Sequence, residues 1–240
     1  IQAFCDLSLP EYTSDIIDVG IQNNGVEHVV PEKMTADEFD TAQFIMTDKE
    51  TNTWKDIYEK KDDLYELKDL SNKELNDIDE ELTIPLIMNY QMRAMEVDTF
   101  KETIAKQMGK DVSAFADMSV EDIGAMMHVD LKSFKQEKED DDGNKIKVDC
   151  VDVRPIFANM LASGAMEKDQ ILSMRDTMED TIDTMGSSLV KSMGIAYAVA
   201  ADKDAGVNVD KIQKSYLLRA GLKMVGMALL MGLVTVLVGF

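Results

Sequence analysis

The end of the chain limits its fold more than any other feature. The last seventeen residues, Met224 to Phe240, hold no charged side chain and are mostly Leu, Val, Met and Gly. As an α-helix such a run is about 25 Å long, slightly short of the roughly 30 Å hydrocarbon core of a bilayer. The run therefore predicts a membrane helix, and we expect this helix to continue beyond Phe240.

Two basic residues place the edge of this predicted span. Arg219 and Lys223 precede the apolar run, and a basic side chain at mid-bilayer costs about 2.5 to 3.5 kcal/mol, so two would cancel the gain from the run. The hydrocarbon edge is therefore expected near Lys223. Ala228 and Gly232 form a small pair at helical spacing, which favours close approach of a neighbouring helix.

The opening stretch predicts a second membrane segment. It is largely apolar through Ile21 and is interrupted by Pro10, which a membrane helix tolerates better than a soluble one. No basic region or small-residue cleavage site marks it as a signal peptide. Asn23-Asn24-Gly25 then predicts a turn.

Charge separates the middle of the chain from its ends. The net charge is −21, yet residues 1–25 contain no base and residues 211–240 contain no acid. Positions 26–210 hold 42 acidic and 21 basic residues. This block repels nucleic acid and attracts cations or basic partners, although solubility alone also explains its charge.

The patterns in the acidic block are mainly helical. Helix starts are predicted by Thr35 with Glu38, Ser71 with Glu74, and Ser119 with Asp122. A long helical pattern covers 167–203, with Gly186 and Gly194 as candidate breaks, and a β-hairpin is predicted around Asp142-Gly143. The expected fold class is mainly α: the end of a first membrane helix in 1–25, a mostly helical insert with one β-hairpin in 26–208, and the start of a second membrane helix in 209–240.

No catalytic, cofactor or metal site is predicted. The acidic run at 139–144 does not match the spacing of a calcium loop, which favours a solvated hairpin tip. His28 and His128 lack a second ligand at zinc spacing and are interpreted as ordinary surface or boundary residues. Trp54, Tyr58 and Tyr65 are expected to pack inside the insert, although an exposed patch for a partner is the alternative.

The two ends resemble those of a known family. The stretch LPEYTSDIIDVGI at 9–21 resembles the end of the first transmembrane helix of bacterial ABC exporters, with Pro10 within the helix and Asp18 and Gly20 in an I-I-D-x-G-I type ending. The stretch YLLRAGLKM at 216–224 is similar to the start of their second transmembrane helix. Most of these exporters have a short external loop there, so this chain resembles a subset with a large extracellular insertion.

The resemblance implies a multi-pass half-transporter of the cell membrane with the insert outside. Such a subunit is surrounded by the lipid bilayer, pairs with an identical or related subunit and uses ATP and Mg²⁺ in a nucleotide-binding domain. This segment carries no phosphate loop, since Gly109-Lys110 is followed by Asp111, so that domain is expected beyond Phe240. The alternative is an acidic extracytoplasmic binding domain anchored by one C-terminal membrane helix, with the opening residues in its soluble fold.

Overall fold

The computed structural model describes residues 10, 12–139, 144–182 and 184–238, and this part of the chain is mainly helical with two small antiparallel sheets. The predicted mainly α class is therefore confirmed. The chain divides into two compact units. Unit 1 comprises Ile1–Asp40, Asp48–Thr83 and Ile182–Phe240, and unit 2 comprises Thr41–Thr47 and Ile84–Thr181.

Unit 1 contains both ends of the described chain and a three-stranded sheet in the order β1-β3-β2. Helix α4 begins in unit 1 and ends in unit 2. The elements of unit 1 are η1 (Ile16–Gln22, a π-helix), β1 (Lys33–Thr35), most of α2 (Ala36–Ala42), α3 (Asp48–Ile57), β2 (Tyr58–Lys61), β3 (Leu64–Leu67), the first half of α4 (Asn72–Arg93), α9 (Ser187–Asp204) and α10 (Val209–Val238).

An aromatic cluster forms the core beside this sheet. Trp54 is fully buried and its Nε1 donates to the carbonyl of Phe39 at 3.1 Å. Tyr58 is also buried and donates to the carbonyl of Pro31 at 2.8 Å, while the rings of Phe39 and Tyr65 stack with centroids 3.7 Å apart. The buried donors of Trp54 and Tyr58 are therefore both paired, so these two rings contribute apolar area without an unpaired donor. The expectation that Trp54, Tyr58 and Tyr65 pack inside is confirmed.

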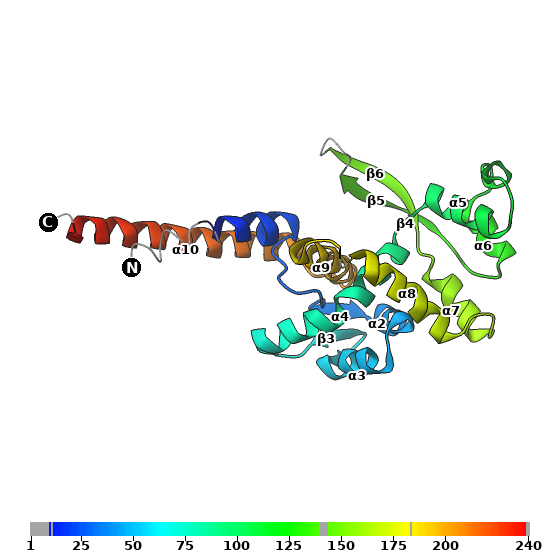
Figure 1. Cartoon of the computed structure of the whole chain (residues 1–240), viewed down its shortest axis with the longest axis horizontal. Helices are drawn as coiled ribbons and strands as arrows, with labels where there is room; N and C mark the ends of the chain where they lie inside the picture. The colour runs from blue at the N-terminus through cyan, green and yellow to red at the C-terminus, as the bar shows by residue number, and fades with distance from the viewer. Residues whose placement is uncertain (1–9, 11, 140–143, 183, 239–240) are drawn as a thin grey trace. The chain divides into compact units, whose positions relative to one another are not determined.

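The π-helix η1 packs against α10, so the two described ends of the chain run side by side (Figure 1). Gly20 is buried at this contact, and a Cβ placed on it would lie 2.6 Å from Cδ2 of Leu217. Gln213 Nε2 donates to the carbonyl of Gly20 at 2.9 Å. The predicted turn follows, and in it a Cβ on Gly25 would lie 2.8 Å from Cα of Gln213. Two glycines therefore allow the close approach.

Unit 2 is a helical unit that carries a long β-hairpin (Figure 1). One core contains Phe100, Phe115, Ile123 and Val151, and a second forms around Ile45 and Ile171. Its elements are η2 (Gln43–Ile45), the second half of α4, β4 (Met95–Glu96), α5 (Val97–Gln107), η3 (Val112–Phe115), α6 (Val120–Met126), β5 (Ser133–Glu139), β6 (Lys145–Val151), α7 (Arg154–Ala162) and α8 (Lys168–Ile182).

Most local signals in the sequence correspond to the structure. Full capping boxes form at Ser71 and Ser119, and at Thr35 the hydroxyl accepts the predicted bond from Glu38 N at 3.2 Å. The long helical pattern breaks at Gly186, which precedes α9, whereas Gly194 lies inside that helix. The predicted hairpin is confirmed with Lys138 opposite Ile146 in register, and its tip at 140–143 lies outside the described residues.

Two local features differ from the expectations. Apolar and charged residues alternate from Lys145 to Cys150, a pattern that predicts a half-buried strand, but Ile146 is 42% exposed and only the end of β6 near Cys150 is buried. The sheet of unit 1 was not predicted, because β2 and β3 are only four residues long and three of the four residues of β2 are charged. Ion pairs support it, since Lys61 Nζ lies 2.6 Å from Glu59 and 3.0 Å from Glu66.

The predicted membrane segments are described only in part. Within the described residues, no helix combines the length and apolar character needed to cross a bilayer. Pro10 is helical and exposed, and Ala228 is exposed on α10. Gly232 belongs to the stretch 230–240, whose side chains lie outside the described residues.

The close approach at Gly25 gives a stability prediction. Gly25 and Gly206 have similar positive φ angles, +78° and +81°, but Gly206 has open space where a Cβ would lie. Gly206→Ala should destabilise unit 1 by about 1 kcal/mol through backbone strain alone. Gly25→Ala should cost roughly 1 to 2 kcal/mol more, because its Cβ meets backbone rather than a flexible side chain. Urea unfolding followed by Trp54 fluorescence measures both, and equal losses would contradict this packing.

Candidate functional site

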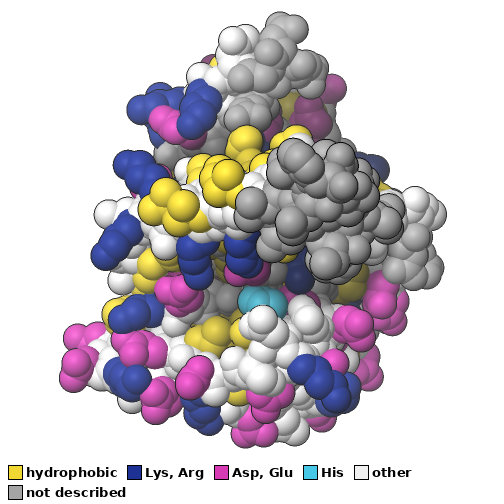
Figure 2. All heavy atoms as spheres, turned by 90° about the vertical axis from the view of Figure 1, so that its left-hand side faces the viewer, with side chains coloured by type: hydrophobic (Ala, Val, Ile, Leu, Met, Phe, Trp, Pro, Cys, Tyr) yellow, Lys and Arg dark blue, Asp and Glu magenta, His cyan; other side chains and the backbone are white. Residues whose placement is uncertain are grey.

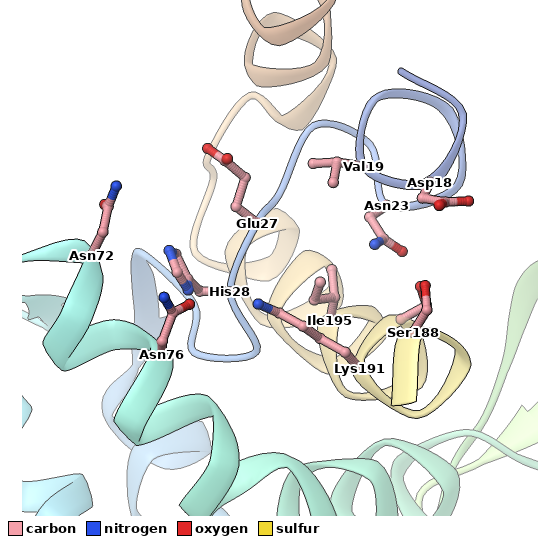
Figure 3. Close-up of a pocket in the computed structure, with 11 residues that line it drawn as sticks. Asp18, Val19, Asn23, Glu27, His28, Asn72, Asn76, Ser188, Lys191 and Ile195 are labelled. Atoms are coloured by element: carbon pink, nitrogen blue, oxygen red, sulfur yellow. The ribbon is translucent and has the colours of Figure 1, made fainter. Parts of the chain in front are cut away.

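A polar cleft of about 290 Å³ lies in unit 1, where η1, the loop after it, α4 and α9 converge (Figure 3). It is open to solvent, and polar side chains outnumber apolar ones around it. On the face of the molecule in Figure 2, a histidine ring reaches the surface among polar and charged side chains. The lining residues are Asp18, Val19, Asn23, Glu27, His28, Asn72, Asn76, Ser188, Lys191, Ser192 and Ile195.

A buried carboxylate holds the floor of the cleft together. The Asp79 side chain is 6% exposed, and its Oδ2 lies 2.9 Å from His28 Nδ1 and 2.8 Å from Lys191 Nζ. Its Oδ1 accepts the backbone N–H of Val29 at 2.9 Å. Burial alone would raise the pKa of Asp79, but the hydrogen bonds from His28, Lys191 and Val29 outweigh it and hold that pKa below the ordinary value. Asp79 therefore joins the loop, α4 and α9 while it is ionised.

The walls consist of neutral polar side chains at helical spacing. Asn72 and Asn76 stand four residues apart on α4, and Ser188 and Ser192 stand four residues apart on α9, so each pair lies on one helix face. In Figure 3 the two asparagines lie across the cleft from Ser188. Amides and hydroxyls both donate and accept hydrogen bonds, so these walls suit a polar ligand.

Two carboxylates complete the lining. Asp18 comes from η1, where it accepts a hydrogen bond from Ser14 Oγ at 2.9 Å, and Glu27 comes from the loop after η1. Neither forms an ion pair with any described residue. Lys191 and the ring of His28, which also line the cleft, both lie within hydrogen-bond distance of Asp79. The cleft therefore has more acidic than basic character.

The residues singled out by the sequence have different places in unit 1. Asp18 lines the cleft, and Gly20 lies in the same π-helix at the contact with Leu217. Pro10 and Ala228 are not among the lining residues. His28, interpreted as an ordinary surface or boundary residue, is partly buried with its side chain 21% exposed, and its ring also has a buried carboxylate partner. No sequence pattern predicts that residues 28, 79 and 191 lie close together, because only the fold brings them into contact.

A second buried acid lies in unit 1 outside this cleft. Asp202 on α9 is fully buried, and its Oδ1 accepts the backbone N–H of Lys33 at 2.9 Å. Its Oδ2 has no hydrogen-bond partner among the described residues. Burial raises the pKa of Asp202 to about 7, with the charge of Glu32 adding to the effect and the bond from Lys33 opposing it. This carboxyl therefore binds a proton near neutral pH.

Comparisons with family models, with curated proteins and with solved structures found no match for this chain. The described residues also contain no group of three His, Cys, Asp or Glu side chains placed to hold a metal ion. The interpretation of the cleft therefore depends on its own geometry and charge.

The Asp79 network gives a prediction with a pH signature. Asp79→Asn should cost about 1 to 3 kcal/mol at neutral pH, because it leaves Lys191 beside a neutral amide. Since the folded-state pKa of Asp79 is lowered, the difference between wild type and variant should be complete above about pH 5 and shrink as pH falls through the folded-state pKa. Urea unfolding across pH measures it. Asp77→Asn, an exposed position on α4, is the matched control and should change stability little.

Ionisation of Asp202 should affect stability in the opposite direction from ionisation of Asp79. The folded-state pKa of Asp202 lies above the unfolded value, so its ionisation costs stability progressively between about pH 4 and pH 7, and the full cost applies at higher pH. Asp202→Asn imitates the protonated form, so it should stabilise unit 1 by roughly 2 to 4 kcal/mol above about pH 7 and by little near pH 4. The same unfolding series measures this effect. Equal stability of wild type and variant at every pH would show that the buried carboxyl does not titrate as described.

Proposed function

We propose that this chain is part of the transmembrane domain of an ATP-driven bacterial ABC exporter half-transporter. In this proposal 1–25 is the end of the first membrane helix, 209–240 is the start of the second, and 26–208 is an extracellular insert beside the substrate exit. The cell membrane is its location, and a second half-transporter subunit, identical or related, is its partner. ATP and Mg²⁺ act in the longer protein, not in this segment.

The contact between η1 and α10 is the observation that carries the proposal. Two consecutive membrane helices joined by an external segment must return the chain to the place where it left the bilayer. Gly20 and Gly25 meet α10 at Leu217 and Gln213, which supports such a return. Asp18 and Gly20, the motif residues behind the resemblance, lie in the packed π-helix itself.

Apolar side chains on the outside of this helix pair give further support. Ile17 and Ile21 on η1 are 46% and 58% exposed. On α10 a row at helical spacing is still more exposed: Leu218 65%, Leu222 63%, Val225 58% and Leu229 65%. Exposed apolar rows of this length are costly in water, whereas lipid tails or neighbouring helices would cover them without cost. The single-anchor alternative accounts for α10 but leaves Ile17 and Ile21 exposed to water.

Cysteine labelling in intact cells tests the proposed topology. In a Cys5→Ser, Cys150→Ser background, Ile17→Cys and Val225→Cys should resist a membrane-impermeant maleimide, because Val225 lies within the span and neighbouring helices of the exporter cover Ile17 at its outer edge. Met174→Cys is the matched control, since Met174 is an insert residue with 49% exposure, close to the 46% of Ile17. It should be labelled rapidly.

The labelling results distinguish the exporter topology from the single-anchor topology. Protection of both Ile17→Cys and Val225→Cys supports the exporter topology, and protection of Val225→Cys alone supports a single anchor. Labelling of both at the rate of Met174→Cys would contradict either membrane reading. In vesicles, the full-length protein should hydrolyse Mg-ATP in a vanadate-sensitive manner, and absence of that activity would contradict the exporter class.

A further inference from the structure

The cleft has more carboxylates than cations to pair with them. Lys191 Nζ and His28 Nδ1 both lie within hydrogen-bond distance of Oδ2 of Asp79, so Lys191 already has a carboxylate partner. Asp18 and Glu27 have no cationic partner among the described residues. An anion entering the cleft would have to compete with Asp79 for Lys191 and would meet two like charges. A cation meets two carboxylates that no protein cation occupies.

A buried amide provides an independent indication of a ligand. Asn23 is 7% exposed and lines the cleft at the end of η1. Its side chain makes no hydrogen bond with another described residue, although its backbone bonds to Asp18 and Val26. The residue is nine-tenths buried, but its amide atoms are not among the fully enclosed ones, so the amide faces the cleft, where a ligand group can bond to it. In Figure 3 Asn23 projects between Asp18 and Ser188.

A second, smaller hollow also borders Glu27 and includes Arg219 and Lys223. Neither of these bases lies within ion-pair distance of Glu27. They weaken the attraction of Glu27 for a cation without neutralising it, so Asp18 and Asn23 are expected to provide the stronger half of the site.

We propose that this cleft binds a small organic cation that carries two ammonium groups, one at the carboxylate of Asp18 and one at that of Glu27, with a polar body against Asn23, Asn72 and Ser188. The volume of about 290 Å³ is at the lower end for ligand sites and fits a molecule of amino-acid or short polyamine size. The proposal depends only on the cleft, so it stands whether or not the chain belongs to an exporter.

Three four-carbon probes test the required charge. The full chain, purified in mild detergent, is titrated in a calorimeter with 1,4-diaminobutane, the neutral 1,4-butanediol and the anionic succinate. The diamine should bind with a measurable heat that falls as salt is added, whereas the diol and the diacid should bind far more weakly. Absence of diamine binding at millimolar concentration, or tighter binding of succinate, would overturn the proposal.

Variants localise the binding. Asp18→Asn with Glu27→Gln should weaken diamine binding by about ten- to a hundredfold, and Asn23→Ala by several-fold. The control is Asp62→Asn with Asp63→Asn, which makes the same change in charge at exposed positions on the β2–β3 turn. Equal weakening in this control would show general charge attraction rather than a site. Urea unfolding of each variant, followed by Trp54 fluorescence, separates lost binding from lost folding.

Discussion

The close approach of η1 to α10 is the constraint on which unit 1 depends. It requires residues without side chains at two points, because Leu217 occupies the space beside Gly20 and backbone at Gln213 occupies the space beside Gly25. The positive φ of Gly25 also turns the chain toward the cleft loop. Glu27 and His28 are positioned by this turn, so the packing of the two ends and the shape of the cleft share one cause.

Buried carboxylates have two different environments in this unit. Asp79 has three donors and is held ionised, so it ties a loop to two helices. Asp202 has one partnerless oxygen in an otherwise buried setting, and burial raises its pKa to about 7. Both acids are almost completely buried, so their partners decide the difference in pKa: Asp79 has Lys191, His28 and a backbone N–H beside it, whereas Asp202 lies near the charge of Glu32. In a chain with a net charge of −21, the hydrogen-bond donors and cations around each buried acid therefore determine whether that acid stabilises the fold.

The sequence predicted what depends on neighbours along the chain. The caps at Ser71 and Ser119, the turn at 23–25, the break at Gly186 and the hairpin after Ser133 all follow from local chemistry. It could not predict the cleft, because His28, Asp79 and Lys191 are far apart in sequence and each is ordinary alone. The short strands β2 and β3 were also missed, since four residues are too few to show an alternating pattern, and their pairing and the packing of Tyr58 and Tyr65 on Phe39 depend on the fold.

Oxidative cross-linking in cell membranes tests the central claim that the two ends pair directly. A Cβ on Gly20 lies 2.6 Å from the Leu217 side chain, so Gly20→Cys with Leu217→Cys brings two thiols together. In a background without Cys5 and Cys150, this account predicts rapid disulfide formation within one chain. Failure to form the bond in a folded, membrane-inserted protein would contradict the pairing of η1 with α10.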